Sequence, residues 1–253
     1  MVYVPPGTFW MGANKDGNEC PTNAQDPSGT ASELPCHSVT VPGFLVDKYE
    51  VTKAAYQAYY DANGGVACKN PGDGASCTPS NTSTGCNWWA TGYEQRPLTC
   101  VSWYQMDGYC KGMGRRLCSE AEWERAARGS DGRLYPWGNQ NPTCIYTVMG
   151  EGGYGCGTGS TMEVGSKTPG ASPYGAMDMA GNVLEWVDDW FHDTYGGAPI
   201  DGSAWVSPVS SKRVARGGSY GDSAVWQRTT VRFAFNPASG AVGLGSRCCM
   251  SPP

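Results

Sequence analysis

The chain has 253 residues, 16% of them charged, and a formal net charge of −5. A chain of this length can bury a substantial core. Its weak negative charge excludes the basic surface of a nucleic-acid-binding protein, so we expect no nucleic acid among its partners. The 36 glycines, 18 prolines and 10 tryptophans are typical of a loop-rich fold rather than a helical bundle.

The sequence shows neither of the segments that direct a chain into or across a membrane. No apolar run approaches the ~20 residues of a membrane span, and the opening Met1-Val2-Tyr3 does not start a signal peptide. We therefore expect no membrane span in this chain, and an export signal that has been removed or lies outside this sequence.

The twelve cysteines give the clearest indication of the cellular compartment in which the protein works. Their number is even, no C-x-x-C pair occurs and only two histidines are present, which disfavours zinc sites of the usual spacing. We interpret the cysteines as six disulfides, with several free buried thiols as the alternative. Disulfides persist in oxidising compartments, which predicts an exported protein, either periplasmic, on the cell surface or extracellular.

The first fifty residues predict strands joined by a polar loop. The segment 1–13 alternates apolar residues and ends near a glycine, which suits an edge strand and a turn. Residues 13–36 are polar and bracketed by cysteines, so we expect a loop closed by Cys20 and Cys36. The segment 37–52 is strand-like, with an apolar set that consists of Val39, Val41, Phe44 and Val46.

A helix is predicted within 50–65, followed by a second loop. One face of this helix carries small and aromatic side chains, and the helix stops at a glycine pair. The members of that face are Ala54, Ala55, Ala58 and Tyr59. Residues 66–99 have few apolar positions and contain three cysteines, so we expect another loop closed by disulfides.

Two helices with clear start signals follow. Each begins at a capping box, one formed by Ser102 with Gln105 and the other by Ser119 with Glu122. Glycines at 114 and 129 stand where the helix ends need positive φ. Beyond residue 130 there is almost no helical period, only turns, short strands and aromatic anchors. The pattern predicts one α+β domain with large loops and no linker.

Six blocks of sequence carry a family resemblance. They are PPGTFWMG, VDKYEVTKAAY, VSWYQMDGYCKGMGRRLCSEAEWERAARG, YPWGN, SPYGAMDMAGNVLEWVDDW and RVARGGSY. In this order, and over nearly all of 2–249, they resemble the formylglycine-generating-enzyme (sulfatase-modifying factor) domain. The resemblance implies a C-type-lectin-like variant: an irregular, loop-rich α+β fold stapled by disulfides. It would form a single domain over 1–253, with a groove built largely by its C-terminal part.

The resemblance also implies part of the disulfide pattern. The family pairs the cysteine of its GYC motif with that of its final FRC motif, here Cys110 and Cys248. Cys118 and Cys249 are additional cysteines beside both motifs, and we expect a parallel second bond between them. Two local pairs are predicted, Cys144–Cys156 and Cys20–Cys36. Four cysteines stay without a predicted partner: Cys68, Cys77, Cys86 and Cys100.

The block MAGNVLEW resembles the family's calcium-binding segment, and calcium is the cofactor that we expect. Calcium binds carboxylate, amide and backbone oxygens, which Asn182 and Glu185 would supply together with neighbouring backbone oxygens. The alternative is structural, with Asn182 capping a turn and Glu185 pairing with an arginine.

The copper site of the family's enzymes is the main departure from the resemblance. Those enzymes oxidise a substrate cysteine with O₂ at copper(I), which is held by two cysteines five positions apart just after GGSY. Asp222 and Gln227 occupy these positions here. Neither replaces a thiolate for a soft copper(I) ion, so we expect no copper and favour a non-catalytic function. The alternative is a sulfatase-modifying-type oxidoreductase that acts on protein cysteine through an atypical site.

The segment 220–246 is predicted to form much of a site that binds a protein or another surface ligand. The resemblance extends to variable proteins of diversity-generating retroelements, in which this stretch forms a hypervariable surface on a fixed frame. Fifteen positions between the frame residues (221–225, 231, 233–235 and 238–243) contain no Met, Trp, Gln, Lys or Glu. Mutation of adenines in AAC codons cannot produce those five types, which favours a diversified surface.

Aromatic side chains among small ones suit recognition, because they offer contact area at a low cost in conformational entropy. The alternative is that the aromatic residues, Trp226 in particular, belong to the core. The predicted ligand-binding residues are Tyr220, Asp222, Ser223, Val225, Trp226, Val231, Phe233, Phe235, Ser239, Val242 and Ser246.

Overall fold

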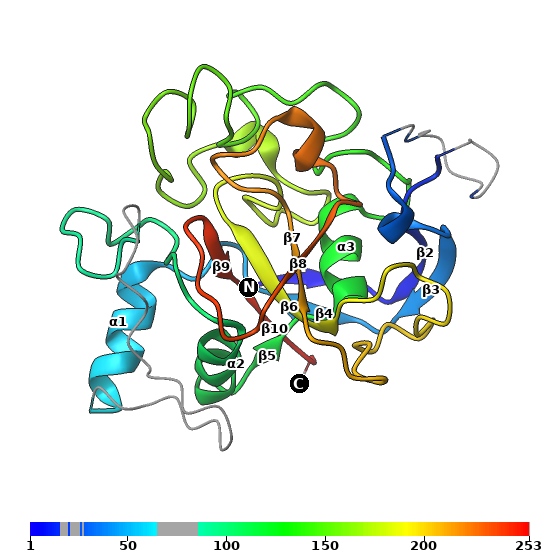
Figure 1. Cartoon of the computed structure of the whole chain (residues 1–253), viewed down its shortest axis with the longest axis horizontal. Coiled ribbons are helices and arrows are strands. Elements are labelled where there is room, and N and C mark those ends of the chain that lie inside the picture. The colour runs from blue at the N-terminus through cyan, green and yellow to red at the C-terminus, as the bar shows by residue number, and fades with distance from the viewer. Residues whose placement is uncertain (16–19, 21–25, 27, 65–85, 253) are drawn as a thin grey trace.

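The computed structural model describes residues 1–15, 20, 26, 28–64 and 86–252, which form a mixed α/β structure with long loops (Figure 1). The described strands make two four-stranded sheets and one two-stranded sheet. This confirms the loop-rich α+β class that the sequence predicted. No helix in these ranges is both long and apolar enough to cross a membrane.

The first sheet brings together segments from both ends of the chain. All of its strand pairs are antiparallel, and the C-terminal strand β10 lies between β4 and β5. In order across the sheet, the strands are β1 (Val2–Val4), β4 (Phe44–Val46), β10 (Cys248–Met250) and β5 (Arg116–Leu117). The small sheet pairs β2 (Gly7–Met11) with β3 (His37–Val41). The predicted apolar set of β3 and β4 is buried, as expected.

Helix α1 (Lys53–Ala62) forms where the sequence predicted a helix, but it buries a different face. Its buried side chains are Lys53 and Tyr56, whereas the alanine-rich face is partly or fully exposed. The Tyr56 ring lies 5.7 Å from Trp88 and 5.4 Å from Tyr109 between ring centroids. These aromatic contacts remove more apolar surface from water than alanines can, and they set the orientation of the helix.

Helices α2 (Trp103–Gly112) and α3 (Glu120–Arg128) begin at the two predicted capping boxes. In each box the serine hydroxyl accepts from the backbone N–H three residues on, and that residue's side chain accepts from the serine N–H. The boxes join Ser102 to Gln105 and Ser119 to Glu122, at 2.8–3.2 Å. Gly114 and Gly129 both have φ of 70°, so both predicted helix ends are confirmed.

The second four-stranded sheet carries most of the C-terminal segment. Strands β8, β7 and β6 are antiparallel neighbours, and β9 runs parallel to β6 at the other edge. Helix α3 lies beside this sheet (Figure 1). In order, the strands are β8 (Arg232–Phe235), β7 (Arg213–Arg216), β6 (Leu184–Trp190) and β9 (Leu244–Ser246).

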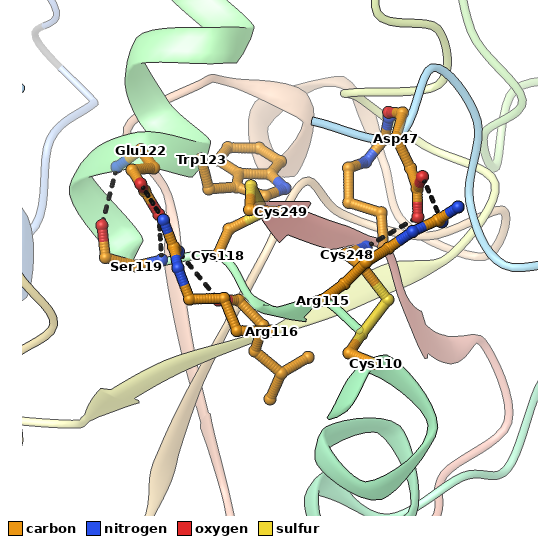
Figure 2. Close-up of a disulfide and its surroundings, with 12 residues drawn as sticks. Asp47, Cys110, Arg115, Arg116, Cys118, Ser119, Glu122, Trp123, Cys248 and Cys249 are labelled. Atoms are coloured by element: carbon orange, nitrogen blue, oxygen red, sulfur yellow. Dashed lines mark hydrogen bonds and ion pairs between the residues drawn. A yellow bond between two sulfur atoms is a disulfide. The ribbon is translucent and has the colours of Figure 1, made fainter. Parts of the chain in front are cut away.

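All ten cysteines within the described ranges are paired, so the alternative of free thiols does not hold there. The structure contains the four predicted pairs and adds a fifth, Cys86–Cys100. Cys68 and Cys77 lie outside the described residues. Figure 2 shows Cys110–Cys248 and Cys118–Cys249 side by side, where they tie α2 and the start of α3 to β10.

Candidate ligand-binding surface

Buried arginines hold the strands that support the C-terminal segment. Arg216, at the end of β7, has no exposed surface and pairs with Glu124 of α3. The same guanidinium donates to the carbonyl oxygens of Thr229 at 2.8 Å and Thr230 at 2.7 Å. Because a buried guanidinium needs both charge and hydrogen-bond partners, these contacts fix the stretch that leads into β8.

Three buried carboxylates lie around a second arginine. Arg247 donates to both oxygens of Glu185 at 2.6 Å. The nearby carboxyl groups of Glu50 and Asp178 also favour its positive charge and raise its pKa. Burial raises the pKa of Asp178 to about 6, and Glu185 adds to the shift. Burial, reinforced by Asp178 and Glu185, also raises the pKa of Glu50 well above its usual range. The three carboxyl groups outnumber the single guanidinium, so the protonation of a carboxyl group in this cluster stabilises the folded state.

Asp178 gives the fold a pH dependence with a defined sign. Its pKa of about 6 lies above the ordinary 3.8, so the folded state holds the proton more tightly than the unfolded chain. The resulting stabilisation is complete below pH 4 and is lost as the pH rises through 6, at a cost of roughly 3 kcal/mol. We expect Asp178→Asn to flatten the fall in unfolding free energy between pH 4 and 6, measured by urea denaturation.

A control for this profile is Glu163→Gln, which changes an exposed carboxyl in a neighbouring segment. This variant should show the same fall in the free energy of unfolding between pH 4 and pH 6 as the unmodified protein. The same fall in Asp178→Asn as in the unmodified protein would show that Asp178 is not the titrating group.

The two predicted calcium ligands already bind protein groups. The Asn182 side chain donates to Glu50 at 2.7 Å, and its oxygen accepts from the Met162 N–H at 3.0 Å. Both oxygens of Glu185 accept from Arg247, and one of them also accepts from the Trp123 indole at 2.8 Å. In this arrangement neither side chain has an oxygen free of protein hydrogen bonds, so a calcium ion would have to compete with Arg247 for Glu185.

The two positions that the sequence matches to the family's copper cysteines lie close together. The Asp222 carboxylate accepts from the Ser219 N–H at 2.8 Å and from its hydroxyl at 2.7 Å. The buried Gln227 amide lies 3.4 Å from the Asp222 carbonyl oxygen, and it packs against Gly218, which has a φ of 72°. Neither position supplies a thiolate, and every cysteine that the structure describes is in a disulfide, so no thiolate pair for copper(I) is present in this part of the chain.

A row of partly exposed aromatic rings begins between these two positions, at Trp226, and continues into β8. Trp226, at the end of the 3-10 helix η3 (Ala224–Gln227), is 41% exposed and lies 5.6 Å from Phe233 of β8. Phe233 lies 6.5 Å from Phe235, which packs edge-on against Trp186 at 6.0 Å. Trp226 is therefore a surface residue rather than part of the core. We call Trp226, Phe233 and Phe235 the aromatic row.

Two of the predicted ligand-binding residues are in the interior. Val231 and Ser246 are each 1% exposed. The Ser246 hydroxyl donates to the carbonyl oxygen of Trp186 at 2.8 Å, within the sheet. Since a ligand cannot reach either side chain, we leave both out of the surface. The remaining nine predicted residues are exposed or half-buried: Tyr220, Asp222, Ser223, Val225, Trp226, Phe233, Phe235, Ser239 and Val242.

The loop closed by Cys144–Cys156 borders this surface, which the sequence did not predict. Backbone hydrogen bonds of 2.8 Å join Gly150 to Asp222 and Gly155 to Tyr220. Tyr154, two residues before the closing Cys156, is 65% exposed, and its ring lies 6.3 Å from that of Tyr220. An exposed aromatic residue inside a glycine-rich disulfide loop was the available signal. The loop and η3 lie at the same end of the molecule, at the top in Figure 1.

The loop 238–243 meets a second disulfide. The Cys100 N–H donates to the Ala241 carbonyl at 3.2 Å, and Gly240 packs so closely on Cys100 that a side chain there would clash with its carbonyl oxygen. Because Cys100 is bonded to Cys86, this disulfide supports the loop that exposes Ser239. The candidate surface thus consists of the loop 144–156, the segment 220–227, the loop 238–243 and strand β8. Buried arginines and disulfides hold these segments in place.

Comparisons with known proteins place this structure in a family. The family model of the sulfatase-modifying factor enzyme 1-like domain matches residues 1–252. Formylglycine-generating enzyme of Streptomyces coelicolor is 30% identical over 98% of this chain and 88% of its own length. Serine/threonine-protein kinase Pkn1 of Chlamydia trachomatis is also 30% identical over 98% of this chain, which spans 38% of that kinase.

Two solved structures have a similar fold. PvdO from Pseudomonas aeruginosa matches with a TM-score of 0.78 and 29% identity, over 99% of this chain and 94% of its own. Treponema denticola variable protein 1 matches with a TM-score of 0.72 and 22% identity, over 100% and 95% of the two chains. On this family match, identity and fold, the chain belongs to the sulfatase-modifying factor enzyme 1-like (formylglycine-generating enzyme) domain family.

Proposed function

We propose that this domain binds a protein or another surface ligand through its C-terminal surface and carries out no reaction there. The observation that carries the proposal is the aromatic row, which is partly exposed in the same segment as the replaced copper positions Asp222 and Gln227. Exposed aromatic side chains are frequent anchors of binding sites, because each buries a large area while ordering few torsions.

The frame around the surface supports the same function. Arg216 fixes the backbone before β8, and disulfides at Cys100 and Cys156 support the loops on either side. A surface that is ordered before binding loses less entropy on binding. Treponema denticola variable protein 1 has a similar fold, and diversification of the fifteen positions 221–225, 231, 233–235 and 238–243 in this chain is part of our proposal. The disulfides further support an exported location, periplasmic, on the cell surface or extracellular.

Calcium binding at Asn182 and Glu185 stays a prediction, separate from the ligand surface. Its test is the thermal midpoint of unfolding in Ca²⁺ and in a chelator. A rise in the midpoint with Ca²⁺ that Glu185→Gln abolishes would support the site. Equal midpoints in Ca²⁺ and in the chelator would show that this protein binds no stabilising calcium ion.

Trp226→Ala tests the proposed function. The protein is screened against a phage-displayed library of linear and cyclic twelve-residue peptides and against a glycan array. We expect binders whose affinity falls at least about tenfold in Trp226→Ala, because a central aromatic anchor is lost. Tyr3→Ala is the matched control, since Tyr3 is a 52% exposed ring on β1, in the other four-stranded sheet.

The control variant should bind as the unmodified protein does, and both variants should keep its thermal midpoint. Binders that ignore Trp226→Ala would place recognition elsewhere on the molecule. Oxidation of a cysteine-containing sulfatase peptide in the presence of copper(I) and O₂ would instead establish the oxidoreductase alternative.

A further inference from the structure

Strand β8 forms an open edge of its sheet. The order β8-β7-β6-β9 gives β8 a single neighbour, and the pairing runs from Arg216 opposite Arg232 to Arg213 opposite Phe235. In an antiparallel pair every second residue turns its N–H and C=O away from the partner strand. Within the described part of the chain, no hydrogen bond reaches the backbone of 233–235 except in the ladder with β7. The outer groups are therefore available for another strand.

This edge lacks several of the devices that usually protect edge strands. Such strands are blunted by exposed charged side chains, proline, a bulge or a covering segment, and β8 shares with protected edges only its short length of four residues and its inward-turned Arg232. In the first sheet, edge strand β5 carries Arg116, which is paired with Glu122, and in the second sheet β9 at the opposite edge is buried. Strand β8 instead places Phe233, Ala234 and Phe235 at its edge, all partly exposed. The exposed part of this edge, residues 233–235, is aromatic and uncharged, and such an edge favours pairing with another strand.

The side chains beside β8 define what an added strand would carry. Phe233 and Phe235 point to the same side of the strand and continue the row that begins at Trp226. In a peptide strand laid along the edge, alternate side chains would lie over these rings. The faces of aromatic rings attract lysine and arginine, and among the described residues no cation lies over a ring of this row.

The charges nearby also favour a basic partner. The arginine of β8, Arg232, is turned inward, where it donates to both oxygens of Glu120 at 2.7 and 2.8 Å. Arg228, which precedes the strand, is likewise buried against Asp26 and Glu33. Neither of these two arginines is therefore exposed beside the aromatic row, and the whole chain carries five negative charges in excess. A second copy of this acidic chain would be repelled, whereas a basic peptide would be attracted.

We propose that β8 recruits an extended, basic segment of a partner protein as a fifth strand of the sheet. Main-chain hydrogen bonds would supply affinity, and lysine or arginine at alternate positions would contact the aromatic row, as in other strand-addition complexes. This inference rests on the ligand-binding function proposed above and specifies its partner as a linear peptide.

The test uses linear twelve-residue peptides selected from the phage library and then synthesised. We expect them to carry lysine or arginine at positions i and i+2. Methylation of alternate backbone nitrogens should weaken binding at least about tenfold in one of the two alternations and little in the other, because only one set faces β8. Replacing the basic residues by glutamate should weaken binding at least about tenfold, and bound peptide should slow amide exchange at 233–235.

Two results would overturn the inference while leaving ligand binding intact. One is that selected peptides bind equally well with either set of nitrogens methylated, which shows recognition through side chains alone. The other is that only glycans or cyclic peptides bind in a manner that depends on Trp226. If the library and the array both yield no binder that depends on Trp226, the proposed function itself fails, so the two failures are distinguishable.

Discussion

Arg247→Met should lower the free energy of unfolding by at least about 3–5 kcal/mol at pH 7, or prevent folding. The guanidinium is 1% exposed, as is its partner Glu185, and Glu50 and Asp178 lie around the same charge. Removing the cation leaves buried carboxylates without compensation, which costs far more than the pair itself contributes. The carbonyl oxygens of Asp47 and Met177 also lose a donor. Urea denaturation under oxidising conditions measures the loss.

Two comparisons separate electrostatics from packing in this variant. The matched control is Arg133→Met, which removes an arginine from the more exposed pair with Asp131 and should cost no more than about 1 kcal/mol. The double variant Glu185→Gln with Arg247→Met should recover part of the loss, because no charge is then left unpaired at that position. A loss below about 1 kcal/mol in Arg247→Met would contradict the charge argument.

Loss of both long disulfides should cost more than the sum of the two single losses. Cys110–Cys248 and Cys118–Cys249 each close a loop of more than 130 residues. With either bond in place, the other closes a ring of only about ten residues, because its ends lie close to the first bond along the chain. Loop-closure entropy then predicts about 3 kcal/mol for each single removal and about 8 kcal/mol for both.

The alanine variants of these cysteine pairs test this coupling by urea denaturation, with thiol counting by mass spectrometry. The control is the Cys144–Cys156 pair, whose short loop, with a sequence separation of 12, lies inside both long loops and changes their length little. Its removal should cost about 3 kcal/mol and add to either of the others. If the losses of unfolding free energy for Cys110–Cys248 and Cys118–Cys249 are additive, the two bonds do not shorten each other's loop in the unfolded chain, and the loop-closure argument is wrong.

Short-range signals were sufficient for much of the fold. The capping boxes at Ser102 and Ser119 were visible because the chemistry of a helix start lies within four residues. The second long disulfide followed from cysteines placed beside both halves of a known pair. Strands β3 and β4 alternate in the usual way, so their buried positions were predictable from the sequence.

Features set by distant contacts could not be predicted in the same way. Tyr56 determines the buried face of α1 only because Trp88 and Tyr109 lie beside it. Val231 and Ser246 lie in the buried stretches 227–232 and 243–249, and the strand β6 that pairs with Ser246 comes from a distant part of the chain. The acidic cluster combines Glu50 with residues more than 120 positions later, which gives no local pattern.

The central position of β10 has a consequence for the order of events during synthesis. Strands β4 and β5 have no direct pairing with one another, and each pairs with β10. Until the ribosome has added residues 248–250, this sheet lacks its middle strand and Cys110 and Cys118 lack their partners. A nascent chain stopped at residue 240 should therefore be protease-sensitive throughout, because the domain is completed by its last-made strand rather than extended from its first.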